Sequence, residues 1–402
     1  MVSCGAILRC WLYCICGNMD SELGLVDRFE MLRGIINPDY FRQKVRPLLY
    51  AKAGNDAEEV QELVIRSLHN SDFYLKLLSG LFRRPRELMV NVNGVRLMPF
   101  GTAAGLDKDG AAMLPLSRIF GFLEPGTVMA NPREGNAKPR LASADADLDL
   151  YNAMGFPSRG LENFLINIKD YRKKGGSVPV YASICGLPLS ETDAIKVAME
   201  QMRTLVQALS PYVDGFVWNP ASPNTTALGL LRTKEVFRAT AELIADEAPS
   251  KLRMVKMWPY EPGAGQEFTG FVGSFIEGGG HGVVVTNTKM VPGENVPSEK
   301  WGYKSAGRSG RFLKEYRLRA VRDARSAFPK AVVVATGGIY DGEDAYQTFK
   351  AGADMIEGYT PYAFYGLGLL NRLVKGVCEG LRKDGYGSLQ KLQSEVKANA
   401  GE

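Results

Sequence analysis

The sequence predicts an α/β protein, a (β/α)₈ barrel of the TIM type with a small helical domain in front of it. Short apolar segments alternate with amphipathic helical segments beyond residue 95, and such alternation is typical of a parallel sheet covered by helices. Eight strand segments occur in this part of the chain, a number that favours a closed barrel over an open sheet. The 402 residues accommodate one barrel of roughly 250 to 300 residues and an appended element.

The composition is that of a soluble globular protein. Hydrophobic residues make up 45% of the chain and charged residues 23%, which excludes wholesale disorder. The net charge of +5 comes from interspersed acidic and basic residues, and no basic stripe with interleaved aromatic residues stands out. We therefore expect no nucleic acid partner.

The cysteines predict neither a disulfide framework nor a metal site. Four of the six crowd into the first sixteen residues, while Cys185 and Cys378 stand alone in the body, which is not the pattern of a disulfide-rich domain. The terminal cysteines lack a second ligand pair for zinc, and the only histidines are His69 and His281. We expect a reducing compartment and no bound metal.

Residues 1–21 are predicted to be an apolar, cysteine-rich tail. The first seventeen residues are interrupted by Arg9 and are too short for a membrane-spanning helix or a cleaved signal. One interpretation is a membrane-touching or acylated tail. The alternative is a disordered extension, or an upstream start in which Met19 is the true initiator.

Residues 22–86 are predicted to form a helical, membrane-associating segment. Apolar residues recur there at helical spacing, and Asn37-Pro38-Asp39 is typical of a capped helix start with a first-turn proline. Short apolar helices with a basic edge, here residues 83–86, are typical of helices that lie in a bilayer surface. The alternative is that these helices only pack on the main domain.

Residues 87–390 are predicted to form the barrel, and residues 391–402 a tail. The eight strands are expected at residues 100–105, 120–127, 178–186, 215–220, 254–259, 283–288, 332–338 and 355–360. Chemistry in such barrels lies at the carboxyl ends of the strands. Polar residues stand at or after those ends here: Lys108, Asn152, Asn219, Ser222, Asn224, Lys256, Thr286, Asn287 and Thr288.

Glycines after the last two strands predict a phosphate site. Gly337-Gly338 follows the seventh strand and Gly358-Tyr359-Thr360 follows the eighth, where barrels commonly bind phosphate with backbone amides. A tight turn is the alternative explanation for the glycine pair.

Lys256 interrupts an otherwise apolar strand and is expected to point into the barrel mouth. There its ammonium would stabilise developing negative charge, such as that on the edge of a reduced flavin; the alternative is a lysine that snorkels at the strand end.

The loop at residues 219–225 contains two prolines, which limit its freedom. Together with Asn152 and Asn287, it offers paired donors and acceptors to a planar imide ring such as a pyrimidine. Turn formation is the alternative for each asparagine taken alone.

Several motifs carry a resemblance to a known family. The runs AAGLDKDG at 103–110, EGNAKPR at 134–140, NAMGF at 152–156, SPNT at 222–225, VTNT at 285–288 and Ser309-Gly310 resemble those of the class 2, quinone-dependent dihydroorotate dehydrogenases, in the same order. The resemblance covers about residues 30 to 385. The helical segment before the barrel is also similar to that class, whose soluble relatives lack it.

The resemblance implies an enzyme that oxidises dihydroorotate to orotate in de novo pyrimidine biosynthesis, with flavin mononucleotide (FMN) as hydride acceptor and a membrane quinone as final electron acceptor. Ser222 would take the C5 proton while C6 gives hydride to flavin N5, and Lys256 would assist at the flavin. The residues implied to bind FMN are Ala104, Gly105, Thr127, Asn152, Asn219, Lys256, Thr286, Ser309, Gly310, Gly338, Tyr359 and Thr360. Those implied to surround the substrate are Lys108, Asn152, Phe156, Asn219, Asn224, Asn287 and Thr288.

The resemblance also implies that the N-terminal helices admit quinone to the flavin from a bilayer surface. The protein would be peripheral on the inner (cytoplasmic) membrane of a bacterium, because an Arg-rich, Ser-rich leader is lacking; the mitochondrial inner membrane is the alternative. The sequence does not identify the oligomeric state.

The chain departs from the family pattern at a few positions. Ile184 stands where an asparagine is usual, Pro157 replaces another asparagine, and Ala306-Gly307-Arg308 replaces a glycine pair and a leucine; Trp258 and Lys289 are also unusual. Two other functions therefore stay open. One is a paralogous FMN oxidoreductase that acts on another pyrimidine-like substrate, and the other is a catalytically silent, membrane-associated flavin-binding protein.

Overall fold

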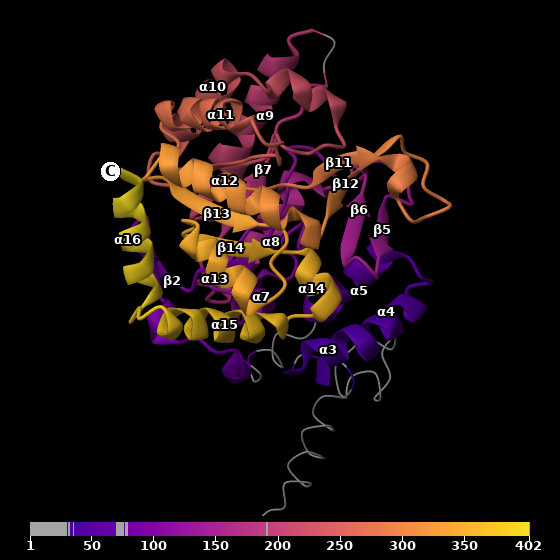
Figure 1. The fold of residues 1–402 in the computed structure, drawn as a ribbon. Helices are drawn as coiled ribbons and strands as arrows, with labels where there is room; N and C mark the ends of the chain where they lie inside the picture. Colours follow the sequence, from indigo (N-terminus) through magenta and orange to yellow (C-terminus); the bar gives the residue numbers. More distant parts are fainter. Residues whose placement is uncertain are drawn as a thin grey trace, which may run out of the picture.

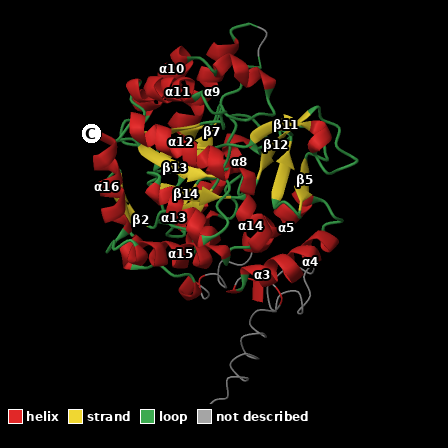
Figure 2. Cartoon of the chain, in the orientation of Figure 1, coloured by secondary structure: helices red, strands yellow, loops and turns green. Residues whose placement is uncertain are grey.

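The computed structural model describes residues 30, 33–34, 36–69, 76, 79–189 and 192–401. The expected tail at residues 1–21 and the first helical residues after it lie outside the described residues. Strands lie in the interior of the molecule and helices surround them (Figure 1). Figure 2 shows the same arrangement by secondary structure.

The predicted barrel is present. Its parallel strands pair in the order β4-β3-β14-β13-β10-β9-β8-β7, and parallel bridges from Leu123 to Val180 and from Val128 to Ile184 join the two ends of this sheet. Each of the eight expected segments overlaps one strand, and β9 and β10 begin two residues and one residue earlier than predicted. The strands are β3 Phe100–Thr102, β4 Phe122–Leu123, β7 Tyr181–Ile184, β8 Gly215–Trp218, β9 Leu252–Lys256, β10 Gly282–Val285, β13 Val332–Thr336 and β14 Met355–Gly358. The (β/α)₈ fold is therefore confirmed.

Burial explains why these segments form strands. All side chains of β10 and β13 are buried, and most of them are valines, which suit strands that are covered on both faces. The outer layer consists of amphipathic helices: α7 Met113–Ser117, α8 Gly160–Lys173, α9 Ala194–Leu209, α10 Lys234–Glu247, α11 Gly265–Glu277, α12 Lys314–Ala327, α13 Gly342–Lys350, α14 Thr360–Tyr365, α15 Leu369–Lys383 and α16 Leu389–Gly401.

Residues 391–401, which we expected to be a tail, belong to α16. Leu389 and Leu392 of this helix are buried. The side-chain amide of Gln393 donates to the carbonyl oxygens of Ala353 and Asp354 at 3.1 and 2.9 Å. The end of the chain therefore covers the barrel as the other helices do.

A four-stranded antiparallel sheet, which the sequence did not predict, stands beside the barrel mouth. Its order is β11-β12-β6-β5, and it places Asn152 and Ser309 at strand ends that face the cavity described below. Its strands are β5 Leu141–Ala144, β6 Asp149–Asn152, β11 Lys289–Pro292 and β12 Ser305–Ser309, and a separate hairpin consists of β1 Val90–Val92 and β2 Val95–Leu97.

The described part of the N-terminal segment is helical, as predicted. It contains α3 Pro38–Tyr40, the π-helix η1 Phe41–Val45, α4 Arg46–Lys52 and α5 Ala57–His69. The side chain of Asn37 accepts from the amides of Asp39 and Tyr40, so the predicted cap is present. In Figure 1 these helices lie near α14 and β5, outside the ring of strands.

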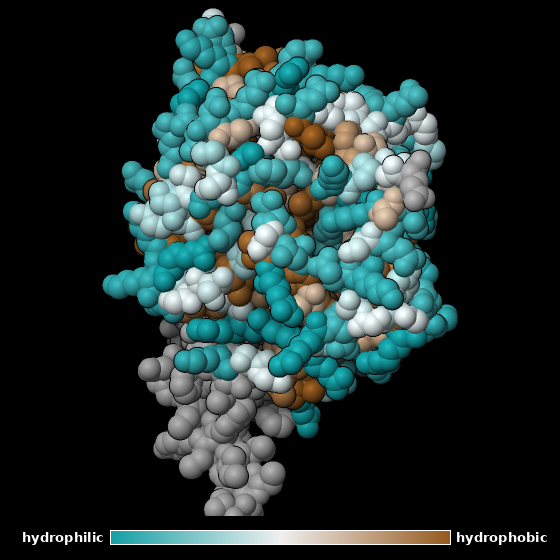
Figure 3. Space-filling model, turned by 90° about the vertical axis from the view of Figure 1, so that its left-hand side faces the viewer, coloured by the Kyte–Doolittle hydropathy of each residue, from teal (hydrophilic) through white to brown (hydrophobic). Residues whose placement is uncertain are grey.

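None of the helices in the described part of the chain is long and apolar enough to cross a membrane. One face of the molecule is mostly hydrophilic, with smaller apolar areas between the polar side chains (Figure 3). Membrane association of the N-terminal helices thus remains a prediction.

Candidate active site

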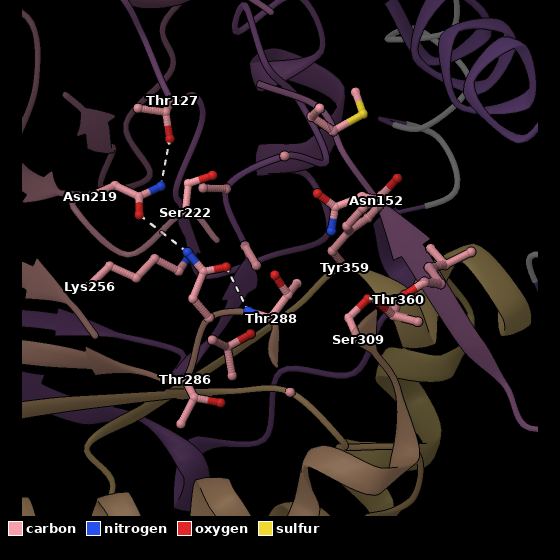
Figure 4. A pocket seen from close by; sticks show the side chains of 18 of the residues that line it. Thr127, Asn152, Asn219, Ser222, Lys256, Thr286, Thr288, Ser309, Tyr359 and Thr360 are labelled. Carbon is pink, nitrogen blue, oxygen red and sulfur yellow. Dashed lines mark hydrogen bonds between the residues drawn. The ribbon is translucent and has the colours of Figure 1, made fainter. Parts of the chain in front are cut away.

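A cavity opens at the carboxyl ends of the barrel strands. Every residue that the sequence assigned to the site lines it except Asn224. Figure 4 shows Asn219 and Ser222 on one side of the cavity and Ser309 and Thr360 on the other. The lining residues come from the ends of barrel strands, from the segments that follow them, and from the additional sheet: Ala103, Ala104, Gly105, Lys108, Gly126, Thr127, Leu141, Leu150, Asn152, Met154, Phe156, Pro157, Asn219, Ser222, Pro223, Lys256, Thr286, Asn287, Thr288, Ser309, Gly310, Leu313, Thr336, Gly337, Gly338, Tyr359, Thr360 and Pro361, with Gln61 from α5.

The amide side chains form two linked pairs. Asn219 donates to the Thr127 hydroxyl at 2.8 Å and accepts from Asn287 at 3.3 Å, contacts that are drawn in Figure 4. Asn224 donates to Asn152 Oδ1 at 2.8 Å, and Asn152 in turn donates to the Gly307 carbonyl at 2.9 Å. Asn224 therefore stands behind Asn152 and holds its orientation, which the sequence did not indicate.

Ser222 lies on the loop after β8, and this loop is fixed by Arg232. The guanidinium donates to the carbonyl oxygens of Pro220 and Ser222 at 3.2 and 3.1 Å and stacks on the Trp258 ring at 4.6 Å. The Ser222 hydroxyl accepts a hydrogen bond from the backbone N–H of Asn224 at 3.4 Å. Within the described residues neither a histidine nor a carboxylate activates this serine, so it is an intrinsically weak base.

Lys108 belongs to a buried charge cluster that α5 completes. Glu58 accepts from the Arg140 guanidinium at 2.9 and 2.8 Å and from Lys108 Nζ at 3.4 Å. Burial raises the pKa of Glu58, but Arg140 and Lys108 lower it more, so the carboxylate is ionised. Two cations and one anion leave a net positive charge beside the cavity, which suits a substrate carboxylate.

Lys256 lies between two buried carboxyl groups. Its Nζ is 2.9 Å from Glu124 Oε1 and 3.1 Å from Glu357 Oε1. Burial lowers the pKa of Lys256, but the two glutamates outweigh this effect and raise it, so the ammonium is permanent. The sequence reasoning missed both glutamates, although each one interrupts an apolar strand region, the same signal that singled out Lys256.

Gln61 of α5 was also missed, and it ties the N-terminal helices to the cavity. Its side chain accepts from the Tyr359 hydroxyl at 2.9 Å and donates to the carbonyl oxygens of Leu106, at 3.1 Å, and Gly105. Helical spacing alone gives no signal for this contact, because its partners are a side chain and backbone carbonyls of the barrel that are distant in sequence.

Residues at several strand ends around the cavity fit a flavin nucleotide. Gly338 has φ +68°, and a Cβ there would lie 2.6 Å from the Lys314 nitrogen, so glycine is required for this turn. A Cβ at Gly105 would find its nearest atom 4.0 Å away, which leaves room for a bound ring. The buried Thr286 hydroxyl has no hydrogen-bond partner within the described structure, and the Ser309 and Thr360 hydroxyls lie 2.8 Å apart. Amides and hydroxyls of this kind are suited to phosphate and to the polar edge of a ring.

Only some of the residues that depart from the family pattern line the cavity. Ile184 is completely buried at the end of β7 and is not one of the lining residues. The hydroxyl of its neighbour Ser183 lies 3.0 Å from that of Thr127. Pro157 does line the cavity. Arg308 is not one of the lining residues, and its guanidinium donates to the Asp149 carboxylate at 2.7 Å.

The comparisons with known proteins agree with this geometry. The family model described as dihydroorotate dehydrogenase matches residues 87–381. A protein of Deinococcus radiodurans named dihydroorotate dehydrogenase (quinone) is 30% identical over 376 residues, 85% of this chain and 96% of its own length. One of the same name from Azorhizobium caulinodans is 32% identical over 304 residues, 72% of this chain and 82% of its own length.

Solved structures show the same likeness. The ligand-free dihydroorotate dehydrogenase of Eimeria tenella has a TM-score of 0.69 and 26% identity, with 81% of this chain and 97% of that chain covered. The complex of that enzyme with ferulenol has a TM-score of 0.70 at the same 26% identity, with 80% and 93% covered. The chain therefore belongs to the dihydroorotate dehydrogenase family, as a divergent member of its quinone-dependent class 2.

Proposed function

We propose that this protein oxidises dihydroorotate to orotate in pyrimidine biosynthesis, with FMN as hydride acceptor and a membrane quinone as final electron acceptor. The observation that carries the proposal is the gathering of Ser222, three amide side chains and Lys108 in one cavity. Quinone-dependent relatives along most of the chain support the choice of acceptor.

The polar set matches the substrate group by group. A planar cyclic imide presents alternating donors and acceptors, and the amides of Asn152, Asn219 and Asn287 can meet both kinds. The positive cluster around Lys108 offers a charge-assisted hydrogen bond to the substrate carboxylate. Binding of this kind orients C5 of the ring toward the Ser222 hydroxyl.

Ser222 takes the C5 proton as the ring loses hydride from C6. When bound, FMN supplies the ring that accepts this hydride and passes the electrons to quinone. Because a serine hydroxyl is a weak base, the surrounding amides must stabilise the charge that develops on the substrate carbonyls. The ammonium of Lys256 would stabilise the negative charge of the reduced flavin.

FMN is the flavin that the phosphate site supports. The backbone at Gly338 and Thr360, with the Ser309 hydroxyl, would hold its phosphate, while Thr127 and Lys256 would face the ring. Ala104, Gly105, Thr286, Gly310 and Tyr359 would complete the binding site, and Asn152 and Asn219 would face both the flavin and the substrate.

We infer further that residues 22–86 form the quinone-associating segment and attach the protein to the surface of a bacterial inner membrane, while residues 87–390 form the catalytic barrel. The contact of Gln61 with Tyr359 supports this division, because it brings α5 to the cavity wall. Apolar helices in this position would let a quinone approach the flavin without crossing water.

The experiment is anaerobic mixing of the yellow holoprotein with dihydroorotate, followed by a quinone analogue. We expect rapid bleaching of the flavin absorbance and its recovery with the quinone. A yellow protein that ignores dihydroorotate would instead indicate another pyrimidine-like substrate, and a colourless one would contradict the flavin site.

A further inference from the structure

Three charged side chains are buried together beneath the cavity. Glu124 follows β4, Lys256 ends β9 and Glu357 lies on β14. Their side chains are 2%, 5% and 0% exposed. Of the three, only Lys256 lines the cavity itself, so the two carboxyl groups act on a ligand through the lysine.

The charges of this cluster do not balance if both carboxyl groups are ionised. One ammonium would face two carboxylates, and a net negative charge in a dry site is costly. Two carboxyl groups in one site resolve this conflict when one of them keeps a proton.

The geometry leaves one carboxyl oxygen free to carry the proton. Glu357 contributes Oε1 to Lys256, while its Oε2 is buried and has no other partner within the described structure. Burial raises the pKa of Glu357 well above its ordinary value, Glu124 raises it further, and Lys256 opposes both. Glu124 and Lys256 are the charged groups that act on Glu357, and the negative charge of Glu124 favours the protonated form of Glu357.

We propose that Glu124 and Glu357 share a single proton, so that the buried cluster is neutral, and that this pair sets how much of the positive charge of Lys256 the flavin experiences. Glu357 is thus a positioning residue for the charge of Lys256. The second half of this proposal rests on the proposed flavin function, whereas the first half concerns the protein alone.

The consequence concerns the flavin redox equilibrium. When the cluster is neutral, no excess negative charge lies behind the Lys256 ammonium. Its positive charge then favours the electron-rich reduced form of the flavin. Loss of the shared proton would add a negative charge under the ring and disfavour reduction.

The first test is infrared spectroscopy of Glu357→Gln, with the exposed Glu299→Gln as control. The variant should lose the carbonyl band of one buried protonated carboxylic acid, and the control should keep it. Glu124→Gln provides a second variant, since the remaining Glu357 would then ionise beside Lys256. Retention of the band in both cluster variants would overturn the shared proton. The measurement needs neither flavin nor substrate, so its failure is separate from that of the proposed function.

The second test is the flavin midpoint potential of the holoprotein. Glu357→Gln should leave it close to the wild-type value, because glutamine resembles the protonated acid. The double variant Glu124→Gln with Glu357→Gln leaves the ammonium uncompensated and should shift the equilibrium toward reduced flavin at least tenfold, about 30 mV for a two-electron couple. A tenfold shift in the single variant, or none in the double variant, would overturn the electrostatic role.

Discussion

The contact between α5 and Lys108 leads to a quantitative prediction for Glu58→Gln. Glu58 is 2% exposed and receives three hydrogen bonds from Arg140 and Lys108, at 2.9, 2.8 and 3.4 Å. Glutamine has nearly the same shape but removes the counter-charge of the buried Arg140 and the half-buried Lys108. Breaking a buried ion pair in this way costs roughly 3 to 5 kcal/mol, and we expect about 3 kcal/mol because the amide oxygen still accepts one hydrogen bond.

The assay is urea unfolding, with Glu59→Gln as the matched control. Glu59 is the next residue on α5 and pairs with Lys138 at 2.9 Å, but both side chains are 43% exposed. Such a surface pair contributes about 0.5 kcal/mol. If Glu58→Gln costs no more than Glu59→Gln, the buried cluster does not stabilise the attachment of α5.

The pH dependence of stability provides a further check on the same residue. The pKa of Glu58 is lowered in the folded protein from its ordinary value of 4.5, by Arg140 and Lys108 against the effect of burial. Its stabilising contribution is therefore complete above pH 4.5 and is lost as the pH falls through the lower folded-state pKa. Glu58→Gln should lose less stability than the wild type on acidification.

Three other predictions concern single residues. Ser222→Ala should slow flavin reduction by dihydroorotate on the order of 100-fold or more while the flavin stays bound; an unchanged rate in stopped-flow measurements would rule out Ser222 as the base. Gly338→Ala places a Cβ 2.6 Å from the Lys314 nitrogen, so it should cost about 1–3 kcal/mol and release flavin, whereas Gly387→Ala, with open space around its Cβ, should do neither. Burial raises the pKa of Asp107 from 3.8 to about 6, so ionisation of this group should lower the free energy of unfolding by about 3 kcal/mol as the pH rises through that window. In thermal unfolding, Asp107→Asn should show a smaller loss of stability than the wild type over the same pH range.

The sequence was sufficient for the barrel because the relevant signals are local. Apolar runs that alternate with amphipathic helices recur along the chain, and each predicted run overlaps a strand. The additional antiparallel sheet was missed because β11 and β12 are partly exposed, so they lack the continuous apolar pattern of the barrel strands. The helical character of α16 was missed for a similar reason: few of its residues are buried.

The sequence indicated which positions along the chain contribute side chains to the candidate site. Side chains such as Asn219, Lys256 and Thr286 stand directly at strand ends, and the carboxyl ends of parallel strands meet at one mouth. The two glutamates beside Lys256 were not predicted, although a carboxylate in an apolar strand is as conspicuous as a lysine. Their importance depends on facing that lysine, and the spacing of residues along the chain does not reveal that.

The sequence by itself determined the fold class, the strand order along the chain and the set of polar residues at the barrel mouth, because all three depend on neighbouring residues and on a regular period. Tertiary structure alone decided which charges meet. Lys256 contacts Glu124 and Glu357 across separations of 132 and 101 positions, and Glu58 reaches Arg140 across 82. Such contacts arise only when the barrel closes and α5 packs against it, since their energies depend on distance and burial in space.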